Sequence, residues 1–387
     1  MNIHGSPQRS MLVGAAVADA ASMGLHWIYA QPRVRRAGGD TPEFTEPDPA
    51  NYEGVPSYFA HAGRHAGDFS MYGESLMVVL RSLAENGEFD WQHYAQQFQG
   101  HFGFGGGYVG YIDTPTRETL INMILQQREL LEAAMAVEFD GSEDTKRSIA
   151  RKVISNAQLV RGEALRKKVS ESIRLTKGDE AEVELAERMI DILEGKVSYA
   201  GADDAQLPAL TKVPVLVAAY HGNPNLEQMV EEAVRVTNNN DEAVDWALFL
   251  TRLLTWSLET DATIGELESQ VKAVLEKSPS HVVTAMEGAL KRRGEDPKTV
   301  TMKIGPACEL NTGVPVAIHN LLTADSYTTA VRRNILACGD SCGRAMVVGS
   351  LAGALFADDE AAGVPSDWID RVTLGDELLR LTEQTVG

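Results

Sequence analysis

The patterns that can be read in this sequence predict a helical fold, and three stretches carry the prediction. Within residues 335–356, small and apolar residues recur at three- and four-residue steps, which is the spacing of one helical face. These residues are Ala345, Val348, Gly349, Ala352, Gly353 and Phe356, and the two glycines predict the close approach of a neighbouring backbone. A second small-residue helix is predicted over residues 11–29, and charged residues at exposed-face spacing predict solvated helices over 140–200.

Each of the two small-residue helices carries one aspartate. Asp340 follows Gly339 at the predicted start of the later helix, where unpaired N–H groups favour an anion. Asp19 lies on an apolar stripe, and burial of a carboxylate is costly unless it meets a donor, a cation or a proton. Taken singly, Asp340 fits an ordinary helix cap and Asp19 a satisfied buried acid. Together, on two helices of this kind, they predict one shared polar centre.

Composition limits the class of protein. The chain of 387 residues is long enough to bury a large core, and without a run of 18 apolar residues no membrane partner is expected. The net charge of −20 opposes binding to a phosphate backbone, so no nucleic-acid partner is expected either. Three cysteines cannot all pair internally, and no basic and apolar leader pattern opens the chain, so we expect a cytoplasmic protein.

The domain organisation follows from the absence of any repeat or heptad run. We expect a single domain over residues 1–387, with 1–10 as a loose lead-in, and the oligomeric state stays open. Two glycine-rich segments are candidates for ligand contact. Residues 61–74, which lead into a helix expected over 75–86, fit an anion or sugar site or a plain turn. Residues 98–117 fit a close backbone approach to a flat or phosphorylated ligand or simple flexibility.

Two motifs resemble those of the ADP-ribosylglycohydrolase family. One is a small-x-x-x-Asp-Ala pattern that ends at Ala20, and the other is Gly-Asp-x-x-x-x-Ala-x-x-x-Gly-x-x-x-Gly-Ala, which begins at Gly339. The similarity extends over nearly the whole chain. It implies an all-α fold, a compact orthogonal helical bundle of the ADP-ribosylglycohydrolase type, with a two-magnesium centre in a cleft that receives ADP-ribose.

The metal motifs of the family are altered in this chain. The family's Thr-Asp-Asp-Thr falls by position on residues 70–73, where Met71 and Tyr72 replace both aspartates. The late Gly-Asp-Thr-Asp-Thr keeps Asp340 but has Cys342 in place of its second aspartate. Magnesium prefers oxygen ligands, so we expect the usual dinuclear site to be lost, with Asp340 left as one candidate ligand. The pattern is similar to the branch that contains J-type crystallins and selenoprotein J.

The residues and the resemblance together indicate which side chains form the site. The candidate catalytic acids are Asp340, Glu74 and Asp19. The candidate substrate-binding residues are Asp68, Tyr72, Gly110, Thr116, Arg117, Asn238, Asn239, Ser341, Cys342 and Arg344. Arg344 is a possible counter-ion of Asp340, and Cys342 at a helix N-terminus is a candidate for a lowered pKa. Asn238 and Asn239 fit an ordinary turn before a helix equally well.

The sequence therefore predicts an enzyme, with one alternative. A hydrolase that cleaves an N- or O-glycosidic bond of an ADP-ribose-like or related ribosyl substrate would use carboxylates and a positioned water around an oxocarbenium-like transition state. Its partner would be a small molecule or an ADP-ribosylated substrate. The alternative is a non-catalytic ADP-ribose-binding or structural protein that keeps the fold and has lost the dinuclear magnesium centre.

Overall fold

The computed structural model describes residues 3–157, 160, 162–259 and 262–386. Regular structure over these ranges consists of α-helices and short 3₁₀ turns, without a β-strand. This confirms the all-α fold that the family resemblance implied. In the same part of the chain, no helix has both the length and the apolar character needed to cross a membrane.

Two helices form the centre of the molecule, α1 (Pro7–Ser22) and α17 (Ser341–Leu355), and most side chains of both are buried. Small residues let the pair pack closely, because a Cβ added to Gly349 would lie 2.4 Å from the carbonyl oxygen of Gly14. The predicted close approach of a neighbouring backbone is therefore confirmed. Since α1 begins at Pro7, the last four residues of the expected lead-in are helical.

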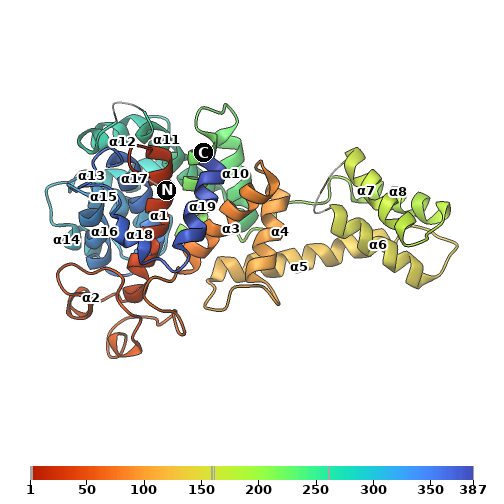
Figure 1. Ribbon diagram of the computed structural model, residues 1–387, viewed down its shortest axis with the longest axis horizontal. Coiled ribbons are helices and arrows are strands. Elements are labelled where there is room, and N and C mark those ends of the chain that lie inside the picture. The colour runs from red at the N-terminus through yellow and green to blue at the C-terminus, as the bar shows by residue number, and fades with distance from the viewer. Residues whose placement is uncertain (1–2, 158–159, 161, 260–261, 387) are drawn as a thin grey trace.

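The remaining helices of the body surround this pair (Figure 1). Those in direct contact with it are α3 (Met71–Asn86), α9 (Val213–Tyr220), α11 (Asp241–Ser257), α15 (Leu310–Leu321), α16 (Tyr327–Leu336), α18 (Ser366–Asp370) and α19 (Gly375–Val386). The others are α2 (Gln31–Gly38), α4 (Trp91–Phe102), α10 (Leu226–Thr237), α12 (Leu267–Leu275), α13 (Ser280–Leu290) and α14 (Pro297–Ile304). The 3₁₀ turns are η1 (Met23–Leu25), η2 (Pro49–Asn51), η3 (Leu207–Leu210) and η4 (Ile264–Glu266).

Helix α3 begins four residues before the predicted helix start at Ser75. Ser70 is the reason, because its hydroxyl accepts a hydrogen bond from the backbone N–H of Tyr72 at 3.1 Å and so caps the helix. The early start places Tyr72 and Glu74 in the first turn of α3, which faces the centre of the body.

A group of helices extends away from the body on one side (Figure 1). The long helix α5 (Thr114–Met135) leads to α6 (Glu143–Ala157), α7 (Gly162–Leu175) and α8 (Glu180–Leu193), which pack on one another and on α5. Their buried apolar side chains form a second core, which includes Leu130, Ile149, Val153, Val169, Ile173, Leu185 and Met189. We call α6–α8 and the end of α5 the helical arm. The solvated helices predicted over 140–200 are thus present, and one face of each is buried.

Candidate functional site

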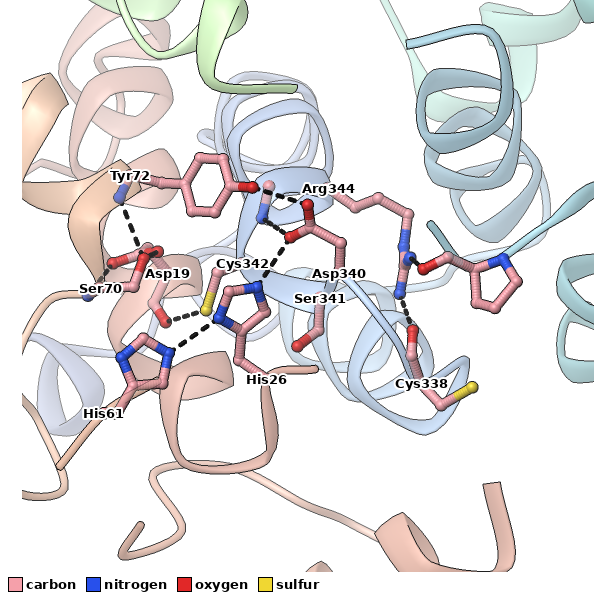
Figure 2. A network of polar contacts seen from close by, with 12 residues as sticks. Asp19, His26, His61, Ser70, Tyr72, Cys338, Asp340, Ser341, Cys342 and Arg344 are labelled. Atoms are coloured by element: carbon pink, nitrogen blue, oxygen red, sulfur yellow. Dashed lines mark hydrogen bonds and ion pairs between the residues drawn. The ribbon is translucent and has the colours of Figure 1, made fainter. Parts of the chain in front are cut away.

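Asp340 lies at the centre of a buried polar network (Figure 2). It caps α17, as predicted, by accepting a hydrogen bond from Gly343 N to Oδ1 at 2.8 Å. The phenol of Tyr72 donates to Oδ2 at 2.6 Å, and Nε2 of His26 lies 2.9 Å from Oδ1. Burial alone would raise the pKa of Asp340, but these donors outweigh it and hold the pKa below its usual value. Asp340 is therefore an anion with donors on both oxygens.

The backbone before Asp340 brings His26 into the network. Gly339 has φ +66°, and a Cβ there would lie 2.0 Å from the carbonyl oxygen of Pro306, so this turn requires glycine. The N–H of Gly339 donates to the carbonyl oxygen of Ile28 at 2.7 Å. This bond ties the segment just after η1, which carries His26, to the start of α17.

A second histidine extends the network on its far side. Nδ1 of His26 lies 2.8 Å from Nε2 of His61, and both side chains are buried. Burial, together with the neighbouring His26 and Arg64, lowers the pKa of His61 well below its ordinary value, so His61 is neutral. The tautomers that satisfy both contacts have His61 donating to His26 and His26 donating to Asp340. The sequence reasoning did not select either histidine, although both occur in stretches that it singled out.

Asp19 joins the same network through Ser70. The Ser70 hydroxyl lies 2.5 Å from Oδ1 of Asp19, and the Ser70 N–H donates to Oδ2 at 2.8 Å. Because Ser70 also accepts from the N–H of Tyr72, a continuous path of hydrogen bonds and one side chain joins Asp19 to Asp340. Burial raises the pKa of Asp19 to about 7, against the opposing effect of the Ser70 bonds. The two acids thus lie close together but differ in protonation.

Cys342 has a different environment from the one that the sequence suggested. The thiol of Cys342 lies 3.7 Å from the carbonyl oxygen of Asp19, and burial together with the charges of Asp19 and Asp340 raises its pKa well above the ordinary value. The expectation of a lowered pKa was therefore wrong, because the carboxylates and the loss of water outweigh the helix terminus.

Arg344 is fully buried and bonds mainly to the backbone before α17. Its guanidinium donates to Oδ1 of Asn334 at 2.9 Å, to the carbonyl oxygen of Cys338, and to that of Pro306 at 3.4 Å. It therefore holds the turn that presents Asp340, while the direct donors of Asp340 are the groups described above. Ser341, next in the chain, has a buried hydroxyl without a hydrogen-bond partner among the described residues.

Glu74 and Asp68 have partners outside this network. Glu74 lies 3.0 Å from Nε2 of His101 and 3.4 Å from Arg64, and its side chain is 9% exposed. Asp68 accepts from the hydroxyl of Thr373 at 2.6 Å and from the N–H of His65 at 2.9 Å, so it ties the loop before α3 to the C-terminal region. The structure does not bring Asp68 to the acids of the centre, and its part in ligand binding stays a prediction.

The predicted substrate-binding residues of the loops lie in three places, of which two are the loop around Tyr111 and the start of α11. Arg117 is exposed, bonds to the carbonyl oxygen of Ile112 and lies over the ring of Tyr111, with Gly110 just before that ring. Asn239 accepts from Arg235 at 3.1 Å near the start of α11.

Thr116 and Asn238 instead line a small cavity beside Tyr72. This enclosed space of about 10 Å³ has room for roughly one water-sized group. Asn238 is buried and donates to Asp204 at 3.3 Å. The cavity is thus lined both by these two predicted binding residues and by Tyr72.

Two residues of this cavity were missed by the sequence reasoning. Asp113 caps α5 through Thr116 N at 2.9 Å, while its Oδ2 is buried and has no hydrogen-bond partner in the described part of the chain. Lys212 is buried, donates to the carbonyl oxygen of Pro208 at 2.8 Å, and has a pKa lowered to about 7 by burial. Neither residue has a local sequence signal, because a helix cap and a lysine before an apolar helix are both ordinary.

Comparison with known proteins agrees with the fold and the motifs. The ADP-ribosylglycohydrolase family profile matches residues 7–387. The chain belongs to this family. Crystallin J1A of Tripedalia cystophora is 26% identical over 97% of this chain and 95% of its own, and crystallin J1B of the same animal is 24% identical over 98% and 95%. A solved structure titled ADP-ribosylglycohydrolase-related protein complex has 16% identity and a TM-score of 0.50, covering 98% of this chain and 96% of its own, and it supports the fold alone.

The ADP-ribosylglycohydrolase family is normally metal-dependent, but the residues of this member do not fit a magnesium centre. At the altered motif positions, Met71 and Cys342 offer no oxygen, and the phenol of Tyr72 donates to Asp340. Within the described residues, no three His, Cys, Asp or Glu side chains are grouped so that they could hold a metal ion. A magnesium ion needs several oxygen ligands in near-octahedral geometry, and Asp340 alone cannot supply them.

Proposed function

We propose that this chain is a non-hydrolytic member of the ADP-ribosylglycohydrolase family, in which the former metal centre has become a hydrogen-bonded core. The observation that carries the proposal is the engagement of both Asp340 oxygens by His26, Tyr72 and Gly343. These three donors occupy three of the roughly four acceptor positions of the carboxylate, so Asp340 stabilises the structure around it and offers little to a metal, a water or a sugar.

Glycoside hydrolysis needs more room than this centre provides. Inverting and retaining enzymes use two carboxyl groups that flank the bond to be broken, with space for the sugar and a water. Here the described cavities are lined by neither Asp19 nor Asp340, and Tyr72 stands between the small cavity and Asp340. Similarity to two crystallins supports the same reading, because a structural use needs the fold and not the chemistry.

A second candidate is a hydrolase that acts without the magnesium centre on an ADP-ribose-like or related ribosyl substrate. One observation favours it: the Glu74 carboxylate, 9% exposed, lies beside His101 and Arg64, and the Arg64 guanidinium lies 4.7 Å from the centre of the Tyr108 ring. An acid, a base and an arginine at one surface could protonate a leaving group and hold a phosphate. In this candidate the reaction would use Glu74, and Asp340 would only support the fold.

One set of incubations separates the candidates. The purified protein is mixed with ADP-ribosylated protein and with O-acetyl-ADP-ribose, with and without magnesium, and released ADP-ribose is measured alongside the thermal unfolding midpoint. The first proposal predicts no release and no change of the midpoint on adding magnesium. Release that requires magnesium would overturn the reasoning on the metal motifs.

Release without magnesium would support the second candidate if it is lost in Glu74→Gln. The matched control is Glu268→Gln, because the Glu268 side chain is 20% exposed, pairs with Lys272 at 2.6 Å and Arg293 at 2.7 Å, and lies on α12, outside the candidate site. Calorimetric titration with ADP-ribose adds a measurement of binding. Neither variant should lose this binding through misfolding. Binding without release in every mixture would identify a binding protein.

A further inference from the structure

The charge of this chain is unevenly distributed. One stretch of the helical arm, residues 145–178, is an exception to the acidity of the chain, whereas α8 of the same arm carries five Asp and Glu and one Arg. Residues 145–178 contain ten Lys and Arg and only two Asp and Glu, whereas the whole chain has 35 and 55. The arm extends away from the acidic body (Figure 1). At physiological salt, exposed charges further apart than about 8 Å are largely screened, so a ligand on α6 experiences mainly the charges close to it.

Part of this positive charge borders a groove of about 450 Å³ along one face of α6. Its lining residues are Asp144, Arg147, Ser148, Arg151, Lys152 and Ser155. Nζ of Lys152 lies 2.5 Å from the hydroxyl of Thr176, so the segment just after α7 lies beside the groove. Three cationic side chains, those of Arg147, Arg151 and Lys152, therefore lie along one open surface.

The cations of the groove are not used by the salt bridges of the arm. Arg166 of α7 is paired with α8, at 2.6 Å from Asp191. By contrast, no carboxylate of the described residues lies within ion-pair distance of Arg147, Arg151 or Lys152. Their charges are therefore available to a ligand.

We propose that this groove binds the phosphate backbone of double-stranded nucleic acid without reading its sequence. Arginine, lysine and serine side chains are the groups that contact backbone phosphates. The lining has no aromatic residue on which a base could stack, and no apolar residue of the kind found at the centre of protein–protein interfaces. Asp144, in the first turn of α6, marks the end of the groove from which a phosphate is repelled.

The proposal modifies the expectation drawn from net charge and is independent of whether the family site hydrolyses anything. Net charge describes the whole chain, whereas backbone binding depends on the few cations that touch phosphates. Three such contacts predict that the logarithm of the affinity falls with the logarithm of salt concentration with a slope of about −2.7, since each phosphate contact contributes about −0.9.

The test is a titration of the full-length protein into a fluorescently labelled DNA duplex of arbitrary sequence, followed by anisotropy at two salt concentrations. We expect an affinity that falls about 40-fold between 50 and 200 mM salt. The triple variant Arg147→Gln, Arg151→Gln, Lys152→Gln should reduce the slope to about zero and weaken binding at least about tenfold at the lower salt. The single variant Arg151→Gln should change the slope by about 0.9 and guards against misfolding of the triple variant.

The matched control removes the same charge from ion pairs of the body. Arg9, Arg252 and Arg293 pair with Glu383, Glu227 and Glu268, and their replacement by glutamine should leave duplex binding as in the wild type. The proposal is overturned if the wild-type protein does not bind the duplex at low salt, or if the groove variants bind like the control. Tighter binding of poly-glutamate than of the duplex would overturn it in favour of an acidic protein partner.

Discussion

Replacement of Tyr72 by phenylalanine isolates the bond on which the interpretation of the centre depends. The phenol is buried and donates to Oδ2 of Asp340 at 2.6 Å, and phenylalanine removes the donor while keeping the ring. The ring still packs in the same place, so the main change is one buried carboxylate oxygen without its hydrogen bond.

The expected magnitude follows from the charge of the acceptor. Hydrogen bonds to charged groups contribute about 1.5–3 kcal/mol, so the free energy of unfolding should fall by about 2–3 kcal/mol in Tyr72→Phe. With an unfolding entropy of about 2.1 cal/mol/K per residue, a chain of this length should lose about 3 °C in Tm.

A matched variant exists in the same molecule. Tyr327 is equally buried and donates at the same distance, 2.6 Å, but its acceptor is the neutral carbonyl oxygen of Gly14. Tyr327→Phe should therefore cost only about 1 kcal/mol. Urea denaturation of both variants at neutral pH gives the comparison, and the difference between them measures the charge of Asp340.

The pH dependence of the stability penalty in Tyr72→Phe can refute the role given to the charge of Asp340. Because the pKa of Asp340 is lowered in the folded state, the stability from its charged form is present above its unfolded pKa and is lost only as pH falls through the lowered value. The penalty in Tyr72→Phe should therefore be constant from about pH 8 to 5 and shrink in stronger acid. Equal penalties in the two tyrosine variants, or none in Tyr72→Phe, would show that Asp340 does not depend on these donors.

Two further predictions concern the centre and the helix pair. Burial raises the pKa of Asp19 to about 7, so the folded state holds a proton that the unfolded state releases, and stability should fall as pH rises from about 4 through 7. Asp19→Asn should flatten this dependence of stability on pH in urea titrations. An unchanged dependence would assign it to other groups. Gly349→Ala should lower the free energy of unfolding by about 1–3 kcal/mol, because its Cβ would meet the backbone of Gly14. Gly288→Ala in α13, where a Cβ meets open space, should instead raise it by about 0.5–1 kcal/mol, and similar effects of the two changes would contradict the packing argument.

The helices were predictable where their signals are local. Small residues at helical spacing identified α17, and the close approach at Gly349 followed from the same residues. The start of α3 was less accessible, because Ser70 is both its cap and the partner of Asp19, which lies 51 positions away in the chain. The apolar core of the helical arm was hidden for a different reason, since its charged exposed faces dominate the composition of that region.

The polar centre was predictable only in part. Two aspartates on small-residue helices led to the expectation of one shared centre, and Asp19 and Asp340 do lie in one network. His26 was not selected because its partner Asp340 is 314 positions away, and nothing nearby distinguishes it from an ordinary core histidine. The error at Cys342 has the same origin: a helix N-terminus is visible in sequence, whereas burial between two carboxyl groups depends on the folded chain.

Two neighbouring acids without a metal pose an electrostatic problem, and the chain resolves it differently at each. Asp340 keeps its charge because three donors surround it, whereas Asp19 is protonated more readily because burial raises its pKa to about 7. Met71, Tyr72 and Cys342 remove three further negative charges that would otherwise need a cation, and two of them, Met71 and Cys342, offer no oxygen. A magnesium ion would have to displace the donors of Asp340 and would find no oxygen from these two side chains in exchange. The substitutions therefore act together, because each makes the network of hydrogen bonds more stable relative to a bound metal.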